Sequence, residues 1–403
     1  MTIPVNRTLS QTQPHASKRI SDRIRSNPNA IDLTVGVPDF GPPQFFRERL
    51  AELVLQGSRE LDAYNDSRGL LELRNAIRNR YGQKYGIELN SREDILVTHG
   101  AAEAIWMAVF ALTNPGDEVM IPDPGYMLYS PIVKSLGRHA IAYPCRPENN
   151  FDPLPDDIAE RISERTRLLI INSPSNPTGN VYDKQLLESI SAIACSADSY
   201  VIHDEVFDET IFSGHHHSLV SSTKWNSGNL LIVNSLSKRF GMTGWRVGWM
   251  LGKKNVIDIV AKAHTYALLS CATSIQKACV LLFEQARVQS EIDTNTRSLA
   301  KRIVGIQERA SSLGFDFDVH KGGCGGFYLF PSVSRLATRL GYRESDVVSC
   351  GEYVAEYLLT KLDIGVVAGS AFGELGVNHI RVSVAGPESL LHKALDRLEQ
   401  HLQ

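Results

Sequence analysis

The chain has 403 residues, of which 43% are hydrophobic and 22% are charged, and its formal net charge is −3. This length exceeds one compact domain, so two domains are expected, and the composition excludes a disordered chain, a coiled coil and a collagen-like fibre. The small net charge is not typical of a nucleic-acid-binding protein, so a small molecule is the expected partner.

The sequence shows no sign of a membrane, export or metal-binding function. No apolar run approaches the length of a membrane helix, and the polar first 20 residues predict no signal peptide, so a cytoplasmic location without membrane contact is expected. The six cysteines include no CxxC pair, which predicts free thiols, no disulfide framework and no metal site.

The N-terminal part is expected to contain an irregular arm followed by one helix. Residues 1–30 are polar and mixed in charge, which predicts the irregular arm. In residues 42–57, PPQFFRERLAELVLQG, apolar residues recur at helical spacing. Pro42 and Pro43 suit a first helical turn, and Gly57 suits its end.

The middle of the chain alternates short apolar runs with amphipathic segments. The runs are nearly continuous, as in parallel strands whose two faces are both covered by helices. Residues 101–113 and 183–195 are two of the intervening segments with helical patterns. This alternation predicts a doubly wound α/β domain, in which ligands bind at the carboxyl ends of the strands. The predicted strands are 95–100, 118–122, 139–144, 167–172, 200–206, 230–235 and 246–252.

A change of pattern near residue 286 predicts a smaller α+β domain. A long helical stretch at 288–314 is followed by the short apolar runs 327–333 and 379–385, and a terminal helix is expected within 387–403. The predicted domains are an arm and part of the small domain at 1–44, a large domain at 45–285 and the small domain at 286–403.

The segment NSLSKRFGMTGWRVGW (234–249) carries the clearest chemical pattern. Lys238 follows directly on a buried strand, and hydroxyl groups, glycines and Arg246 surround it in sequence. Small residues let a backbone approach a ligand, hydroxyls form hydrogen bonds, and an arginine binds an oxyanion. The segment is therefore interpreted either as an amine beside a phosphate site, suited to a Schiff base with pyridoxal phosphate (PLP), or as a solvated loop.

Three further segments follow predicted strands. Asp204 ends a strongly apolar run, so it is either a surface acid or a buried partner of a cation such as the PLP pyridinium. Asn176 lies in the proline-rich loop NSPSNPTGNVY (172–182), which would hold its amide toward a cleft. Gly100, Ala101 and Ala102 begin a predicted helix, whose exposed N–H groups suit an anion, although a plain strand–turn–helix also fits.

The order and spacing of these segments resemble the class I/II aminotransferases, which are fold-type I PLP-dependent enzymes. The resemblance extends from Gly36 to Arg381, and its most specific part is SLSK followed by GMTGWRVG. The resemblance implies a large domain with a mainly parallel seven-stranded sheet, a smaller α+β domain and a homodimer with shared active sites. The other matching segments are GVPDF (36–40), YNDSRGLLELR (64–74), PDPGYMLY (122–129), NPTG (176–179), GGFYLFP (325–331) and GSAFGELGVNHIRVS (369–383).

The resemblance also implies roles for single residues. Lys238 corresponds to the lysine that forms the internal aldimine and moves the proton through a quinonoid intermediate, and Asp204 to the partner of the pyridinium nitrogen. Arg381 corresponds to the arginine that binds the substrate α-carboxylate, with Gly36 in the segment that closes over it. The reaction implied is exchange of the amino group of an α-amino acid with a 2-oxo acid. The remaining implied cofactor contacts are Tyr126 stacking on the ring, Asn176 on its 3′-oxygen, Ser235, Ser237, Arg246 and the Gly100–Ala102 N–H groups on the phosphate, and Tyr64 on the phosphate of the neighbouring subunit.

One position departs from the family pattern. The family has a tyrosine that donates to the 3′-oxygen where this chain has Phe207. We expect loss of this donor to raise the pKa of the internal aldimine. The alternatives to an aminotransferase are a PLP-dependent lyase or cyclase, as in capreomycidine-synthase-like relatives, an amino-acid oxidase, and a PLP-binding regulator without enzymatic activity.

Several other residues are expected to have structural roles. The run His215–His217 is interpreted as a solvated loop rather than a metal site, and Cys324 in GGCGG (322–326) is not interpreted as a nucleophile. Trp106 and Trp225 are expected to be packing residues. Tyr129, His264 and Tyr266 fit either interior packing or a position near the substrate.

Overall fold

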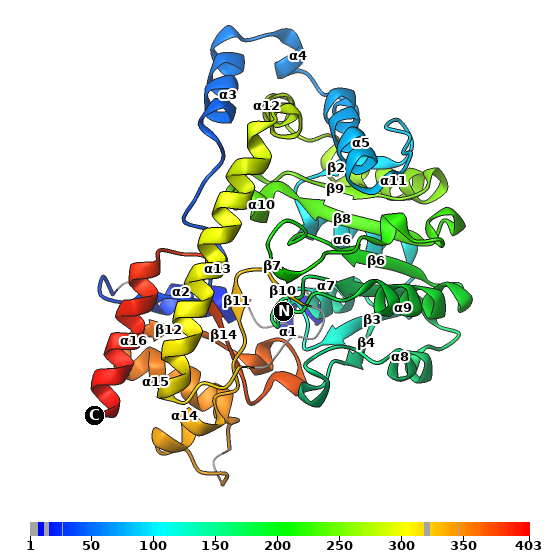
Figure 1. The fold of residues 1–403 in the computed structure, drawn as a ribbon. Coiled ribbons are helices and arrows are strands. Elements are labelled where there is room, and N and C mark those ends of the chain that lie inside the picture. The colour runs from blue at the N-terminus through cyan, green and yellow to red at the C-terminus, as the bar shows by residue number, and fades with distance from the viewer. Residues whose placement is uncertain (1–6, 12–15, 26, 318–322, 346) are drawn as a thin grey trace, which may run out of the picture.

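The computed structural model describes residues 7–11, 16–25, 27–317, 323–345 and 347–403. A seven-stranded sheet forms the centre of its larger part (Figure 1). Strand β9 runs antiparallel to both of its neighbours, and all other adjacent pairs are parallel. All seven apolar runs therefore form strands of one sheet, and the mainly parallel fold is confirmed. The strands, in order across the sheet, are β2 (Ile95–Thr98), β9 (Gly248–Leu251), β8 (Leu230–Ser235), β6 (Tyr200–Asp204), β5 (Thr166–Asn172), β3 (Glu118–Asp123) and β4 (His139–Pro144).

Helices cover both faces of this sheet, which is why its strands are apolar at nearly every position. Leu168 and Ile170 of β5 belong to the core on one face, and Leu169 and Ile171 belong to the core on the other. The helices packed on the first face are α6 (Ala101–Leu112), α7 (Tyr129–Ser135) and α11 (Lys254–Leu268). Those on the second face are α5 (Leu71–Tyr85), α8 (Pro155–Arg161), α9 (Lys184–Ser196) and α12 (Thr273–Glu284).

The C-terminal part has its own sheet and hydrophobic core. Its antiparallel sheet has the order β11–β14–β13, and a separate parallel pair joins β1 to β12. The division at residues 44/45 and 285/286 stays a prediction, and the pairing of β1 with β12 supports placing the N-terminal segment with the small domain. The elements are β1 (Ile31–Asp32), β11 (Tyr328–Leu329), α14 (Ser334–Arg339), α15 (Cys350–Leu362), β12 (Ile364–Gly365), β13 (Val367–Ala368), β14 (Ile380–Ser383) and α16 (Glu388–Leu402).

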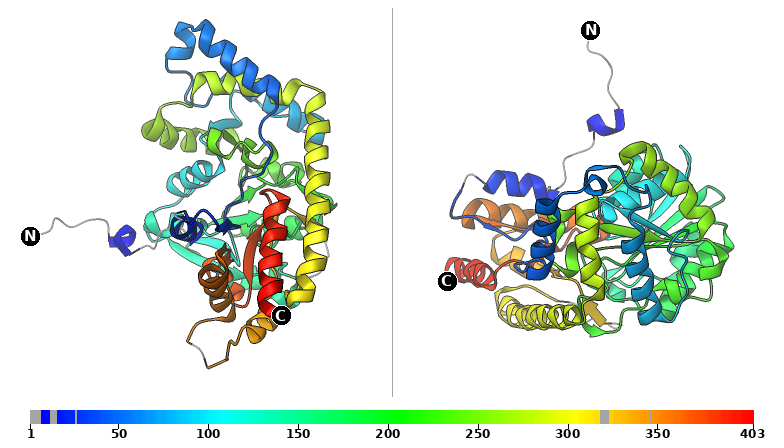
Figure 2. Two further views of the ribbon diagram at one scale, coloured as in Figure 1. Left: turned by 90° about the vertical axis from the view of Figure 1, so that its left-hand side faces the viewer. Right: turned by 90° about the horizontal axis from the view of Figure 1, so that it is seen from above.

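Two long helical patterns predicted from the sequence are confirmed. Helix α13 (Arg287–Leu313) runs from the end near α12 to the small sheet and packs beside α16 (Figures 1 and 2). Helix α3 (Gln44–Gln56) begins after Pro43, which is its N-cap, and ends before Gly57 at φ 59°. It is followed by the short helix α4 (Arg59–Asp62).

The expectation of an irregular arm at 1–30 is wrong for much of the described part of that segment. Helix α1 (Arg7–Gln11) projects outward (Figure 2) but contacts α7, and helix α2 (Ala16–Ile24) packs against β1, β12 and β13. The reason is tertiary, because α2 has few apolar residues but buries Ile24 against Gly365 of β12 and Ser17 beside Arg381 of β14, near the other end of the chain. Residues 1–6 and 12–15 lie outside the described residues.

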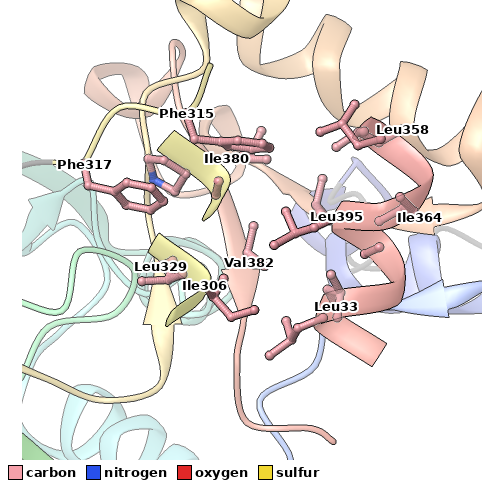
Figure 3. A pocket seen from close by; sticks show the side chains of 16 residues that line it. Leu33, Ile306, Phe315, Phe317, Leu329, Leu358, Ile364, Ile380, Val382 and Leu395 are labelled. Carbon is pink, nitrogen blue, oxygen red and sulfur yellow. The ribbon is translucent and has the colours of Figure 1, made fainter. Parts of the chain in front are cut away.

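The core of the small domain contains a small apolar cavity (Figure 3). Its volume is about 50 Å³, and its lining side chains, such as Leu33, Phe315 and Val382, are all apolar. Without polar groups it has no means of orienting a polar ligand, so we interpret it as a packing void. No helix of the described residues is long and apolar enough to span a membrane.

Candidate active site

A polar cavity of about 140 Å³ lies at the carboxyl ends of β5, β6 and β8. This is the edge at which parallel sheets bind ligands. The cavity brings together ten of the predicted site residues, although they are spread over 146 positions of the sequence. They are Ala101, Ala102, Tyr126, Asn176, Asp204, Phe207, Ser235, Ser237, Lys238 and Arg246, and the lining also includes Ile105, Asn172, Val206, Thr243 and Tyr328.

Lys238 lies in the one-turn helix α10 (Leu236–Arg239), which follows β8 directly. Its amine donates a hydrogen bond to the carbonyl oxygen of Gly36 at 3.0 Å, and the faces of two phenylalanine rings, Phe327 and Phe207, lie 5.4 and 6.0 Å away. Desolvation by this environment is the largest cause that lowers the pKa of Lys238, and Arg381 and Arg246 lower it further. A lowered pKa increases the fraction of the amine that is neutral, and therefore nucleophilic, at a given pH.

Asp204 is a buried carboxylate at the wall of this cavity, 3% exposed. Burial raises its pKa to about 6, although a 2.7 Å hydrogen bond from the Tyr129 hydroxyl and one from the Val206 N–H favour the ionised form. No cation of the described residues forms an ion pair with it. The sequence indicates Tyr129 only as a packing or substrate-side residue and does not reveal its contact with Asp204.

One end of the cavity is built to hold an anion. Gly100 is the N-cap of α6 at φ 87°, and the N–H groups of the first turn have no acceptor within the helix. A Cβ on Gly100 would lie 2.5 Å from the Arg246 guanidinium, so a glycine is needed for the two to approach. The Arg246 guanidinium is held there by the carbonyl oxygens of Thr243 and His99. Ser235 and Ser237 complete this end.

Arg381 is a buried cation whose surroundings in the described chain contain no carboxylate partner. Its guanidinium donates to the Asn176 side-chain oxygen (3.1 Å), the Thr34 carbonyl (2.6 Å) and the Ser17 hydroxyl (3.2 Å), while its Nε has no partner. It also stacks on the ring of Tyr328 at 4.1 Å. Burial lowers the pKa of Arg381, so an anionic ligand would relieve a real energetic cost.

The last two predicted site residues, Gly36 and Tyr64, are not part of the cavity lining. Gly36 lies beside the Lys238 amine, and a Cβ at this position would meet the Tyr328 hydroxyl at 1.9 Å, so no side chain fits. Tyr64 follows α4, is 82% exposed and does not line the cavity of its own chain. Its predicted role therefore depends on a second subunit.

Phe207 is buried beside the cavity and presents no hydroxyl to it. Its ring packs edge-on against Phe327 at 5.0 Å and Tyr328 at 6.1 Å between centroids. Tyr328 also lines the cavity, so its hydroxyl is a tyrosine oxygen at the site besides that of Tyr126. The sequence does not assign Tyr328 to the site. The only sequence signal for it was its place in the GGFYLFP segment.

The interpretation of His215–His217 as a solvated loop is wrong for His216. The side chain of His216 is 3% exposed, and its Nε2 lies 3.3 Å from the buried Glu205, which also contacts His203 at 2.8 Å. His203 of β6, Glu205 directly after it and His216 after β7 thus form a buried cluster, which a linear pattern does not reveal. The described residues contain no group of three or more side chains that could hold a metal ion.

The remaining residues take structural positions. Trp225 is buried and Trp106 stacks on Phe110, and His264 contacts Glu103 at 2.8 Å. Tyr266 is 89% exposed. Cys324 lies in β10 (Gly323–Gly325), which pairs with β7 (Ile211–Gly214), and Gly322 lies outside the described residues.

Comparison with known proteins identifies the family. The model of aminotransferase class I and II matches residues 28–398. An aspartate aminotransferase of Pyrococcus horikoshii is 30% identical over 96% of this chain and 94% of its own, and an aromatic-amino-acid aminotransferase of Thermococcus litoralis is 29% identical over 98% and 97%. The structure of the Thermus thermophilus aspartate aminotransferase with maleate has a TM-score of 0.88 at 27% identity, covering 99% of this chain and 100% of that one. The chain therefore belongs to the class I and II aminotransferase family and is a PLP-dependent enzyme of fold type I that transfers amino groups.

Proposed function

We propose that the polar cavity is the active site of this aminotransferase, with Lys238 as its reactive amine and Arg381 as its binding group for the substrate α-carboxylate. The observation that carries this assignment is the presence, in one region, of a desolvated amine, a buried carboxylate without a cation and a buried guanidinium without an anion. Each unbalanced charge is costly in a protein interior unless a ligand compensates it.

The residues present fit PLP by their charge and hydrogen-bonding chemistry. The Asp204 carboxylate suits the protonated pyridine nitrogen, and the first turn of α6 with Ser235, Ser237 and Arg246 suits the phosphate. Asn176 and Tyr126 also line the cavity. When bound, PLP supplies an aldehyde and an electron-withdrawing ring that stabilises negative charge on the substrate α-carbon.

The chain's own groups perform binding, orientation and proton transfer. Lys238 would supply the amine that holds the cofactor, and the same amine, once free, would accept the proton from the substrate α-carbon. Arg381 fixes the α-carboxylate, which chooses the α-carbon bond that breaks. Asp204 holds a positive charge on the ring nitrogen, and Tyr129 holds Asp204 ionised and in place.

The geometry of the arginine fork predicts a specific loss for Arg381→Lys. Lysine keeps the charge but cannot form the planar pair of bonds, so at least one charge-assisted hydrogen bond is lost. We expect kcat/KM for amino acids to fall about 10- to 100-fold, mainly through a higher KM, with the visible absorption of the bound cofactor unchanged. Steady-state kinetics measure this, and the exposed Arg335→Lys is the matched control. Equal kinetics for the two variants would contradict the assignment.

We also propose a homodimer in which Tyr64 of one subunit reaches the phosphate site of the other. Tyr64 is itself exposed, and exposed apolar side chains also occur on α3 (Val54 and Leu55) and on α11 (Leu268). Such residues are typical of an interface between copies of a chain.

Mixed dimers test this shared site. The Lys238→Ala homodimer should be inactive, because it lacks the reactive amine. The Tyr64→Ala homodimer should lose activity by about 10-fold or more, because it lacks a hydrogen bond to a charged group. If Tyr64 acts across the interface, a mixed dimer has one intact site, and equal mixing should restore about a quarter of wild-type activity. Activity no higher than the average of the two parents would show that Tyr64 acts within its own subunit or not at all.

The reaction is tested by adding amino acids without any 2-oxo acid. The panel should include aspartate and aromatic amino acids, because the relatives are named for them. An aminotransferase releases one equivalent of oxo acid per subunit and then stops. Continued product formation without an oxo acid would instead support the lyase, cyclase or oxidase alternatives suggested by Phe207.

Two further expectations are proposed with this function. We propose the domain division at residues 44/45 and 285/286, which would put Lys238 in the large domain and Arg381 in the small domain. A cytoplasmic location is proposed from the free cysteines and the lack of a spanning helix in the described chain.

A further inference from the structure

Two segments, PDPGY (122–126) and GSAFGELG (369–376), make contacts that the assigned roles leave unused. The first contains the end of β3 in the large sheet, and the second precedes β14 in the small sheet. Asp123, the last residue of β3, joins them through its carboxylate. Its Oδ2 accepts the N–H of Glu374 and its Oδ1 accepts the N–H of Leu375, both at 3.1 Å.

The two segments approach so closely that one position must be glycine. Gly373 has a φ of 145°, and a Cβ on it would lie 2.0 Å from Oδ1 of Asp123. A third hydrogen bond runs from the Gly125 N–H to the carbonyl oxygen of Phe372 at 2.9 Å. Three hydrogen bonds therefore hold residues 369–376 against the end of β3.

The segment held in this way supports the Arg381 guanidinium. This group lies over the rings of Tyr328 and Phe372, 4.1 and 4.8 Å from their centroids. Phe372 is the residue whose carbonyl is held by Gly125, and it directly precedes the glycine beside Asp123. An aromatic face attracts a guanidinium and restricts its plane. The orientation of the arginine fork therefore depends on where residues 369–376 lie.

We propose that Asp123 is a positioning residue for substrate binding that acts through Phe372 on Arg381. The carboxylate holds residues 369–376, these residues hold the Phe372 ring, and the ring orients the fork that binds the substrate α-carboxylate. Asp123 does not line the cavity, so it acts without contacting the substrate. This inference rests on the proposed role of Arg381.

Two substitutions disturb the contact from its two sides. Asp123→Asn leaves one acceptor oxygen in place of two, so at least one of the two side-chain hydrogen bonds is lost. Gly373→Ala keeps the carboxylate but pushes it away, and it gives an independent test if Asp123→Asn does not fold. The matched control is Asp183→Asn, because the Asp183 carboxylate also accepts a backbone N–H, that of Leu186 at 2.8 Å, but lies outside the cavity lining.

Hydrogen exchange of the cofactor-free protein tests the contact itself. The N–H groups of Glu374 and Leu375 are the ones that Asp123 accepts, so they report its loss directly. In Asp123→Asn, the peptide that covers residues 369–376 should exchange about three- to tenfold faster than in the wild type. The same peptide should be unchanged in Asp183→Asn.

Kinetics of the holoenzyme test the action on Arg381. Asp123→Asn and Gly373→Ala should each raise KM for amino acids about three- to tenfold, with kcat and the dissociation constant of the cofactor unchanged. In the Arg381→Lys background the planar fork is already lost. Asp123→Asn should there raise KM further by about twofold or less, because the two residues act on one interaction.

The outcomes separate this proposal from a general structural role and from the proposed function. Fully additive increases in KM in the double variant, or an unchanged exchange rate at residues 369–376, would overturn it. Weaker cofactor binding in Asp123→Asn would also overturn it and would show that the residue acts on Tyr126 instead. Failure of the proposed function would be seen separately, as a wild-type KM in Arg381→Lys alone.

Discussion

Lys238→Ala should abolish both the visible absorption of the lysine-bound cofactor and the transfer of amino groups. The substitution removes the covalent attachment and the group that moves the proton. General acid–base catalysis alone contributes about 10²- to 10⁴-fold, so with the loss of attachment we expect turnover to fall by about 10⁴-fold or more. Absorbance spectra and single-turnover kinetics measure the two effects.

A second lysine controls for nonspecific effects of charge removal. Lys253→Ala removes an amine that lies over the ring of Trp225, 5.5 Å from its centroid and away from the cavity lining. This variant should keep the spectrum and the turnover of the wild type. A visible band that persists in Lys238→Ala would show that another lysine holds the cofactor.

Asp204→Asn should have the next largest effect, because asparagine cannot balance the charge of the pyridinium nitrogen. Breaking a buried charge pair costs about 3–5 kcal/mol, which corresponds to a fall in kcat of roughly 10²- to 10⁴-fold. Tyr129→Phe removes only the 2.7 Å hydrogen bond to Asp204 and should cost about 10- to 100-fold. Equal losses in the two variants would contradict the assignment of the charge to Asp204.

Asp204 also gives the cofactor-free protein a pH dependence of stability. Burial raises its pKa from 3.8 to about 6, so the folded state binds a proton more tightly than the unfolded state does. The contribution of Asp204 to the free energy of unfolding is therefore largest below about pH 4. This contribution falls as the pH rises to about 6. The free energy of unfolding, measured with urea at several pH values between about 4 and 6, should decrease with pH in the cofactor-free wild type. This decrease should be absent in Asp204→Asn.

The sequence predicts the large sheet well because its strands are short apolar runs that are buried on both faces. It does not reveal that β9 is antiparallel, because both directions bury the same side chains. It misses α2, whose few apolar residues find their partners in β12 and β13 from the other end of the chain. Local pattern therefore predicts the elements, whereas long-range contacts decide the direction of β9 and the helical state of α2.

The same limit separates the predicted from the missed site residues. Lys238, Asp204 and Asn176 each follow a strand that ends at one edge of the sheet, so their position can be predicted from sequence order. Tyr129 and Tyr328 reach the cavity from a helix and from the small sheet, and only the fold brings their hydroxyls beside Asp204 and Gly36. His216 is buried because Glu205 lies opposite it, which its own sequence neighbours do not indicate.

The central claim is that this one cavity holds the cofactor on Lys238. Borohydride reduction of the purified holoenzyme fixes the cofactor to its lysine, and peptide mass spectrometry then identifies the modified residue. The account predicts a phosphopyridoxyl group on the peptide that contains Lys238, and none when an amino acid has first converted the cofactor to its amine form. A modification on any other lysine, or none in a protein that shows the visible band, would contradict it.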